Sequence, residues 1–474
     1  MEMTWRESSH PARLEERLDQ QVVRCHLSPR NCTLKPGQHG FCGVRKNIDG
    51  RLVTLNYGKS VQITEETIET EAVNHYAPGE RILSLGNIGC MLNCSYCHNW
   101  KTSQAKHVED KDVFHYTPEK VVALARQYGI RVLSWTYNDP VVWHEFVRDT
   151  SALARQQGLI NLYKSAFYIT PEAIDELLPV IDIFSISLKS WDPAYYKKYT
   201  KGELEPVLEG IKRVHRAGKH LELSTLMITG VSDNEETARK ISSWVLENVG
   251  STTPLHFVRF HPDYRMRDTI RTPIPNLIRA REIALEMGVE HVYLGNVYDT
   301  PFSNTFCRGC DQLLVDRYGL NAWTVGLDDA GRCTRCQRDA HVKFLKPAIP
   351  PPSLETLPAG NEMRSFAWHG DIRSLHVVAA NDANQPVEIY HRRTYQDARS
   401  EPWRVVPLEP GQSFRFSLAK GHADEVGPVV AFPPSVRTNL HEVFDRAHFP
   451  TVSVEQAMAP DDRVPLPIFQ PSRA

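Results

Sequence analysis

The sequence predicts an α/β protein built around a complete or partial (β/α) barrel. Between residues 81 and 300, short apolar segments alternate with amphipathic helical stretches, which is the pattern of βαβ units in a parallel sheet. The six or seven units found there favour a barrel over an open doubly wound sheet. Cysteine-rich segments lie on both sides of this region, so we expect separate modules before and after it.

The segment before the barrel, residues 1–80, is predicted to be a cysteine-bearing module. Its start, MEMTWRESSHPARLEERLDQQ, mixes acidic and basic residues and is predicted to be helical. The next stretch, CHLSPRNCTLKPGQHGFCGVRKNIDG, is rich in glycine and turn residues. We therefore expect little regular structure after the first helix.

The barrel elements follow from hydrophobic periodicity and from helix-start signals. Several helical stretches open with Thr-Pro-Glu, Pro-Glu or Asp-Asn, as helix N-termini often do. Strands are expected at residues 81–86, 131–137, 160–167, 182–189, 220–230, 255–261 and 291–297. Helices are expected at residues 117–129, 141–157, 171–180, 203–218, 234–249 and 274–288.

Residues 301–345 carry two C-x-x-C pairs separated by 22 residues, which is the spacing of a zinc-ribbon-like knuckle. Four thiolates with no spare position favour a closed, structural zinc site, and a second iron–sulfur cluster is the alternative. The four candidate ligands are Cys307, Cys310, Cys333 and Cys336.

Two further segments complete the domain organisation. Residues 346–360, KPAIPPPSLETLPAG, are predicted to be a proline-rich, semi-rigid linker. Residues 361–474 contain alternating apolar and polar segments such as PVEIYHRR and SFRFSLA, and they are predicted to form a small β-rich domain.

Composition narrows the class of protein. The formal net charge of -2 and the pI near 6.9 indicate no general attraction to nucleic acid or to acidic membranes. The N-terminus lacks a signal-peptide core, and no apolar run approaches the roughly 18 residues that span a bilayer. We expect a cytoplasmic protein without nucleic-acid or membrane partners, whose ten clustered cysteines are metal ligands rather than disulfides.

Three chemistries compete for the stretch GCMLNCSYCHNW, which follows the first predicted barrel strand. It contains the haem-attachment pattern C-x-x-C-H, but that pattern gives Cys90 no role and normally functions outside the cytosol. A closed zinc site would need His98, yet adjacent Cys97 and His98 rarely bind one tetrahedral ion. Cys90, Cys94 and Cys97 alone could hold a [4Fe-4S] cluster with one iron left open, and this spacing favours that site.

The C-x3-C-x2-C triplet and Tyr96 before its last cysteine resemble the radical S-adenosylmethionine (SAM) superfamily. Further blocks, in order, resemble AmmeMemoRadiSam-system radical SAM enzymes, which are relatives of pyruvate formate-lyase-activating enzymes. These blocks include GQHGFCGVR, GNIGCMLNCSYCHNWKTSQ, TYNDP, LMITGVSD, HFVRFHPDY and VYLGNV, and they span about residues 20–340. The resemblance implies a radical SAM barrel in which Cys90, Cys94 and Cys97 are the cluster ligands.

The resemblance also implies residues that bind the cosubstrate. Asn138 and Asp139 fall where the family binds the methionyl amino group, usually with Glu before the proline, and Tyr96 is a further cofactor-binding candidate. An alternative role for Asp139 is the N-cap of a helix that begins at Pro140.

Two motifs depart from the family pattern. After the third strand the family commonly has V-T-N-G, where this chain has KSAF from Lys164 onward. After the fourth strand the family has D-L-K, where this chain has Ser187-Leu188-Lys189. Lys189, His256 and His261 are the candidate catalytic residues, because each lies near the end of a predicted strand; ordinary surface, core or capping roles remain open for all three.

The family's N-terminal pattern has four cysteines, whereas this chain has Ser at position 28. Cys25, Cys32 and Cys42 are therefore possible metal ligands. Either His26 or His39 completes the site, or the three cysteines are buried without metal.

The resemblance implies reductive cleavage of SAM to a 5'-deoxyadenosyl radical, which abstracts hydrogen from an unidentified substrate. That substrate could be a protein glycyl residue, a peptide or a small molecule, and the altered strand motifs favour a changed substrate. An external electron donor such as flavodoxin or ferredoxin is implied as a partner. The alternative is a non-catalytic, metal-bearing scaffold or interaction protein.

Overall fold

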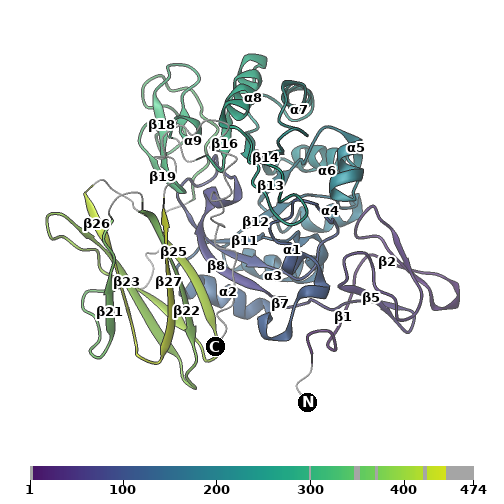
Figure 1. The fold of residues 1–474 in the computed structure, drawn as a ribbon, viewed down its shortest axis with the longest axis horizontal. Helices are drawn as coiled ribbons and strands as arrows, with labels where there is room; N and C mark the ends of the chain where they lie inside the picture. Colours follow the sequence, from purple (N-terminus) through teal and green to yellow (C-terminus); the bar gives the residue numbers. More distant parts are fainter. Residues whose placement is uncertain (1–3, 298–299, 346–352, 369–371, 420–423, 445–474) are drawn as a thin grey trace.

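The computed structural model describes residues 4–297, 300–345, 353–368, 372–419 and 424–444. Seven parallel strands form its centre, and each matches a strand predicted from the sequence (Figure 1). They are β9 (Arg81–Gly86), β11 (Val132–Thr136), β12 (Ile160–Ser165), β13 (Ile183–Ser187), β14 (His220–Met227), β15 (Leu255–Arg259) and β16 (Val292–Gly295).

The seven strands follow one another across the sheet in chain order. Each neighbouring pair is parallel, as expected when a helix connects consecutive strands. In the described part of the chain no ladder joins β16 back to β9. The barrel is therefore partial, and the free side of β9 pairs antiparallel with β8 (Gln62–Thr67).

The helices predicted between these strands are present. They are α2 (Pro118–Gln127), α3 (His144–Gln156), α4 (Pro171–Leu177), α6 (Glu205–Arg216), α7 (Glu235–Asn248) and α8 (Ile274–Met287). Thr117 and Asn234 cap α2 and α7, because their side chains accept hydrogen bonds from backbone N–H groups in the first turn. Shorter helices are α1 (Trp100–Ser103), α5 (Pro193–Tyr195) and α9 (Thr300–Ser303), with single turns at η1 (Asp19–Gln21), η2 (Ile68–Glu71), η3 (Ala105–His107), η4 (Asp110–Asp112), η5 (Pro140–Trp143) and η6 (Tyr196–Thr200).

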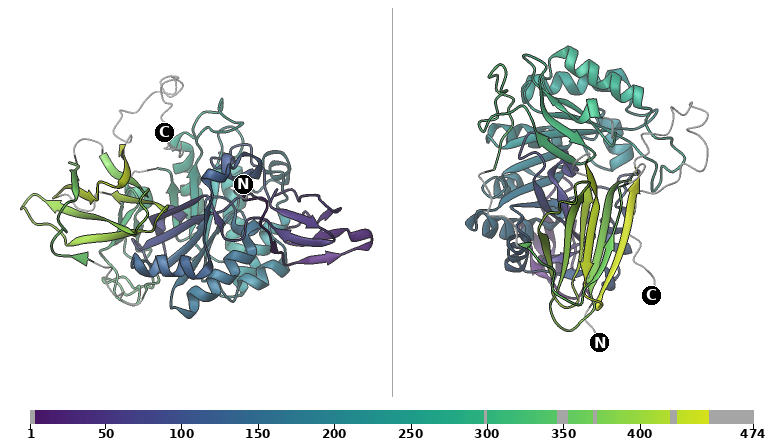
Figure 2. Two further views of the ribbon diagram at one scale, coloured as in Figure 1. Left: turned by 90° about the horizontal axis from the view of Figure 1, so that it is seen from below. Right: turned by 90° about the vertical axis from the view of Figure 1, so that its left-hand side faces the viewer.

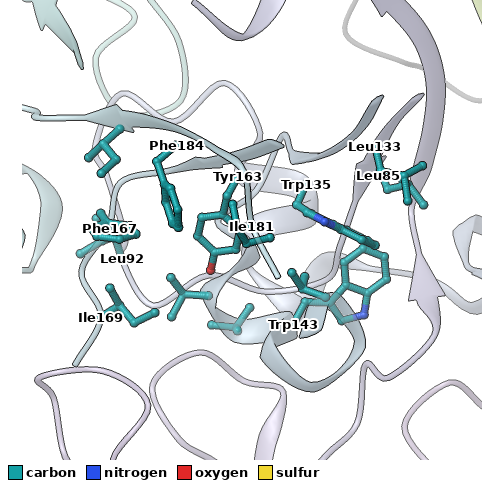
Figure 3. Packing of buried hydrophobic residues seen from close by; sticks show 14 of the residues in the cluster. Leu85, Leu92, Leu133, Trp135, Trp143, Tyr163, Phe167, Ile169, Ile181 and Phe184 are labelled. Atoms are coloured by element: carbon teal, nitrogen blue, oxygen red, sulfur yellow. The ribbon is translucent and has the colours of Figure 1, made fainter. Parts of the chain in front are cut away.

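The main hydrophobic core lies between one face of the sheet and these helices. Trp135, Tyr163 and Phe184 project from adjacent strands into this layer, where Trp143 and Phe167 also pack (Figure 3). The Trp135 and Trp143 rings meet edge to face at 5.7 Å. Aromatic side chains of this size supply much of the free energy of burial, which fixes the strands relative to the helices.

The other face of the sheet is polar. Lys164 pairs across strands with Ser185, and Ser185 pairs with Glu222, so these side chains share that face. Near the strand starts, Ile68 and Val73 close the interior against the first residues of the strands. Polar groups therefore line the part of the interior nearer the carboxyl ends, where barrel active sites lie.

The N-terminal module is built of short strands, and the predicted N-terminal helix is wrong. Glu15 pairs with Cys25 in an antiparallel ladder, and Glu16 forms ion pairs with Arg24 and His26 on the neighbouring strand. The alternating charges thus serve cross-strand pairs rather than helix turns. The strands are β1 (His10–Pro11), β2 (Glu15–Arg17), β3 (Val23–Cys25), β4 (Cys32–Leu34), β5 (Arg45–Ile48), β6 (Arg51–Thr54) and β7 (Lys59–Ser60), which pairs with β10 (Phe114–His115).

The C-terminal region is β-rich, as predicted, and it continues the barrel sheet. Strand β25 (Ser413–Ala419) pairs in parallel with β8, and β22 (Ile372–Asn381) and β27 (Val436–Phe444) extend the same sheet. A second sheet packs beside them (Figure 2). It contains β20 (Ser353–Leu354), β24 (Trp403–Leu408), β23 (Val387–Tyr395), β26 (Glu425–Phe432) and β21 (Glu362–Ser365).

Part of the predicted linker, residues 353–354, belongs to this second sheet as β20. Residues 346–352 and 445–474 lie outside the described residues. None of the helices in the described chain is both long and apolar enough to cross a membrane.

Candidate functional site

The cysteine triplet lies in the loop that leaves β9. Backbone hydrogen bonds hold this loop, because the Asn93 and Ser95 N–H groups donate to the carbonyls of Thr200 and Tyr199. Gly89 has a positive φ of 90°, and a Cβ there would lie 2.8 Å from the Cys42 carbonyl oxygen. Only glycine fits at this close approach, which fixes the position of the backbone just before Cys90.

The three thiols are partly buried, and at least one pair of their sulfurs is more than 4.8 Å apart. Cys90, Cys94 and Cys97 do not belong to either set of described residues whose ligand atoms all lie within 4.8 Å of one another. One tetrahedral ion would hold its sulfurs about 3.8 Å apart, whereas a cubane binds each cysteine through a separate iron. The spread fits a [4Fe-4S] cluster better than a mononuclear site.

His98 does not complete a zinc site with these cysteines. Its Nε2 lies 3.1 Å from the carbonyl oxygen of His261, and the two imidazole rings are 4.3 Å apart. His98, His261 and Asp263 instead bring their ligand atoms within 4.8 Å of one another. The Asp263 Oδ2 is buried without a hydrogen-bond partner, so it remains available to a bound group.

Burial raises the pKa of the cysteine thiols. The pKa of Cys94 is raised to about 12 by burial, although Lys189 acts to lower it. Burial also raises the pKa of Cys90, and the negative charge of Asp139 raises it further. Because thiolates are the metal-binding form, these sites need the positive charge of metal ions to ionise, which irons would supply.

Two of the sulfurs have hydrogen-bond partners. The Leu92 N–H donates to Cys90 Sγ at 3.4 Å, and Cys97 Sγ lies 3.5 Å from the Ser103 hydroxyl. Donors of this kind stabilise sulfur-bound charge and tune the reduction potential of a cluster. Tyr96 lies between Cys94 and Cys97 in the sequence. Its side chain is buried, and its ring centroid is 6.3 Å from that of Tyr195.

Asp139 is fixed in the loop after β11. It caps η5, with Oδ1 accepting from the Val141 N–H at 3.3 Å and from the Ser165 hydroxyl at 2.7 Å. Its Oδ2 accepts from the Ala166 N–H at 2.7 Å. The capping role considered above is therefore present, and the same bonds place a carboxylate beside Cys90.

Asn138 ties the loop after β11 to the cysteine loop. Its amide donates to the Asn87 carbonyl at 2.5 Å and accepts from the Thr102 hydroxyl at 3.0 Å. Asn99 of the cysteine loop adds a second bond between the two loops, because its amide donates to the Tyr137 carbonyl. The structure thus brings Asn138, Asp139 and the cysteine loop together.

The three candidate catalytic residues separate into two groups. Lys189 and His261 adjoin the cysteine loop, where the Lys189 charge acts on the thiols of Cys94 and Cys97. His256 lies inside the sheet, buried, with Nε2 2.8 Å from a carboxylate oxygen of Glu222. Burial lowers the pKa of His256, while Glu222 acts to raise it. Its contacts are those of a core histidine.

Sequence reasoning missed a polar cluster in the sheet interior. Glu222 accepts hydrogen bonds from His220, His256 and the N–H groups of Asn74 and His75. Glu71 accepts from Ser134 at 3.0 Å and from Thr136 at 2.8 Å. The signal was a charged residue within an otherwise apolar strand, as in HLELSTLM and INLYKS, because such residues are rarely buried without a specific role.

The knuckle brings its four cysteines together between β17 (Thr305–Phe306), β18 (Leu313–Tyr318) and β19 (Asn321–Thr324). The Sγ atoms of Cys307 and Cys336 are 3.4 Å apart, and those of Cys310 and Cys333 are 3.6 Å apart. All four lie within 4.8 Å of one another. These separations match one tetrahedral ion with four thiolates, as in a structural zinc site.

The N-terminal cysteines form no comparable group. Arg45 donates to Cys25 Sγ at 3.6 Å and pairs with the buried carboxylate of Glu145. His26 bonds to Glu16 and Asn31 rather than to a thiol. None of these contacts assigns a metal to the three cysteines.

Two surface cavities, of about 430 and 910 Å³, lie beside the N-terminal module rather than at the cysteine loop. The larger one is lined by several glutamates and by Arg213 and Arg216, both in α6. We place the candidate site at the cysteine loop because the candidate metal ligands and the nearby charged groups are there.

Comparisons with known proteins agree with this geometry. A family model described as the radical SAM superfamily matches residues 87–244, which begin just after β9 and include the cysteine loop and the four parallel strands β11, β12, β13 and β14. The chain is 39% identical over 322 residues to an uncharacterized protein of Methanocaldococcus jannaschii, covering 68% of this chain and 96% of that one. The chain therefore belongs to the radical SAM superfamily.

Its relatives include activating enzymes. The chain is 22% identical over 195 residues to the pyruvate formate-lyase 1-activating enzyme of Escherichia coli, covering 39% of this chain and 75% of that one. A radical SAM methyltransferase from Sphaerobacter thermophilus is a structural neighbour, with 13% identity, a TM-score of 0.36, and coverage of 64% of this chain and 81% of that one.

Proposed function

We propose that this protein reductively cleaves SAM and uses the resulting 5'-deoxyadenosyl radical to abstract hydrogen from a substrate. The observation that carries the proposal is that Cys90, Cys94 and Cys97 lie in a loop that Asn138 bonds to the loop after β11, near the Asp139 carboxylate and the Lys189 ammonium. Three ligands hold three irons of a [4Fe-4S] cluster, and the fourth iron supplies the electron-transfer and chelating chemistry when the cluster is bound.

The residues around the loop have distinct proposed roles. Asp139 would accept hydrogen bonds from an ammonium group, with Asn138 fixing its loop against the cysteine loop. Lys189 would bind a carboxylate, because its ammonium has no hydrogen-bond or ion-pair partner among the described residues. His261, whose pKa is lowered to about 4 mainly by burial, would be a neutral hydrogen-bonding group beside the reacting atoms.

The reaction needs an electron, so we propose an external donor such as a flavodoxin or a ferredoxin. The substrate is a protein glycyl residue, a peptide or a small molecule. All ten cysteines are free, which suits a reducing compartment such as the cytoplasm. Zinc is proposed for the knuckle, where it would be structural.

The test is anaerobic reconstitution with iron and sulfide, followed by dithionite reduction in the presence of SAM. The expected result is release of 5'-deoxyadenosine by the wild type and by Cys32→Ala, a matched control in the N-terminal module. Cys94→Ala is expected to release none. If a protein that carries the cluster releases no 5'-deoxyadenosine with any reductant, the scaffold alternative is correct instead.

A further inference from the structure

The ammonium group of Lys164 lies at the polar interior face of the sheet. Its Nζ donates to the hydroxyls of Ser185 at 3.0 Å and Ser224 at 3.2 Å, which come from the two next strands. Both acceptors are neutral, and the side chain of Lys164 is partly exposed to solvent. An ammonium has three N–H donors, so one remains for a ligand that arrives from the solvent side.

The carboxylates near Lys164 are engaged with other donors. Glu71 accepts from Ser134 and Thr136, and Glu222 is saturated by two histidines and two backbone N–H groups. Neither forms an ion pair with Lys164 within 4.0 Å among the described residues. A partly desolvated cation without a contacting anion is costly, and a bound anion would remove that cost.

A second cation adds to the positive charge. Burial lowers the pKa of Lys164 to about 8; Glu71 and Glu222 act to raise it, and Lys189 acts to lower it. Lys164 is therefore mainly protonated at neutral pH. It also lies close enough to Lys189 for the two positive charges to repel each other. Two ammonium groups therefore lie near the carboxyl ends of adjacent strands, and the two carboxylates that act on Lys164 are already hydrogen-bonded to other groups.

Serine hydroxyls complete the arrangement. Ser187 lies opposite Ser224 in the β13–β14 ladder, and their hydroxyl oxygens are 3.2 Å apart. Ser187 is partly exposed and stands where the D-L-K motif has Asp, while Lys164 stands in the segment that replaces V-T-N-G. Lys164 and Ser187 both contact Ser224. Relative to the family motifs, Ser187 puts a hydroxyl in place of a carboxylate, and Lys164 adds an ammonium group.

We propose that Lys164, with the hydroxyls of Ser187 and Ser224, binds a carboxylate group of the substrate. The substrate class is then an anionic, carboxylate-bearing molecule, whether free or part of a peptide. This inference rests on the proposed function, since it assigns the substrate of the same site. The methionyl carboxylate of SAM offers the same chemistry, so the experiment must separate the two sources.

The experiment measures binding of radiolabelled malonate to anaerobically reconstituted full-length protein by equilibrium dialysis, with and without saturating SAM. Wild type is expected to bind malonate when SAM is present. Lys164→Gln should weaken malonate binding about tenfold or more, as expected for the loss of a charged hydrogen bond. Lys164→Arg, which keeps the charge, should weaken it less, and Lys240→Gln on the outer helix α7 should leave it unchanged.

Two further readouts separate the outcomes. Malonate affinity should fall as the pH rises through about 8, where Lys164 loses its proton, and SAM affinity should be equal in wild type and Lys164→Gln. Failure of wild type to bind malonate, or equal binding by a folded Lys164→Gln, overturns the inference. Loss of SAM affinity in Lys164→Gln with competition between malonate and SAM also overturns it, because Lys164 would then hold the cosubstrate. Release of 5'-deoxyadenosine is measured in parallel, so the proposed function stands or falls separately.

Discussion

The cysteine loop and the knuckle both offer cysteine sulfur atoms as ligands, but they form two different kinds of site. In the knuckle, four sulfurs lie within 4.8 Å of one another, and no position is left for another ligand. In the loop, three partly buried sulfurs that do not all lie within 4.8 Å of one another are found near Lys189 and Asp139. The difference shows that ligand number and sulfur spacing, rather than cysteine content, separate a structural metal site from a site that can take a cosubstrate.

The largest expected effect comes from removing one loop ligand. Cys97→Ala should lose the iron and sulfide of the central cluster and all release of 5'-deoxyadenosine, because two thiolates cannot hold the cubane. Its zinc content should remain at one ion per chain. Metal analysis and product chromatography on the same sample check this, and simultaneous loss of zinc would contradict the independence of the two sites.

The converse variant should show the reverse pattern. Cys333→Ala should lose the knuckle zinc and lower the melting temperature, since metal binding contributes directly to the stability of small thiolate sites. Iron content and 5'-deoxyadenosine release should persist below the new melting temperature. Calorimetry with metal analysis measures both. Retention of zinc by this variant would mean that the knuckle does not close around one ion.

Metal uptake should also depend on pH at both sites. Burial acts to raise the pKa of Cys333, but backbone N–H groups of Cys336 and Arg335 lower it to about 7, below its ordinary value of 9.0. The stabilisation from this thiolate is fully present above pH 9 and is lost as the pH falls through 7. Zinc should therefore be released on mild acidification.

The pKa is raised to about 12 both for Cys94 of the loop and for Cys310 of the knuckle, so uptake of iron and of zinc should keep increasing through pH 8 to 9. Uptake of each metal from pH 6 to 9, followed by absorbance and zinc analysis, gives the two curves. Uptake that does not change from pH 6 to 9 would contradict the raised pKa values of these thiols.

The smallest expected effect concerns a single hydrogen bond. Ser103→Ala removes the hydroxyl 3.5 Å from Cys97 Sγ and should destabilise the ligated thiolate by about 1 kcal/mol. The cluster should still assemble, with a small shift of its reduction potential measured by electron paramagnetic resonance titration. An unchanged potential would show that this hydroxyl does not donate to the sulfur.

Hydrophobic periodicity predicted the seven parallel strands, because the face of each strand that the helices cover requires apolar residues. The cysteine spacings predicted two sites whose geometry the structure distinguishes. The register between strands was not predictable, so the meeting of Lys164, Ser187 and Ser224 could not be inferred from three separate segments. The charged N-terminus was predicted as a helix because its charge pattern does not show the turn at η1, which brings Glu16 opposite Arg24.

The pairing of β25 with β8 has a consequence for how the chain is made. Strand β8 is synthesised early, but the strand that covers its free edge lies some 350 residues later, at Arg415 and Phe416. Until that segment emerges, an unpaired edge of a large sheet is exposed, and such edges promote association between chains. Tyr128, which stacks on Phe414 at 4.5 Å, would then guide the late segment onto an already folded surface. Truncated forms that end before β25 should therefore self-associate.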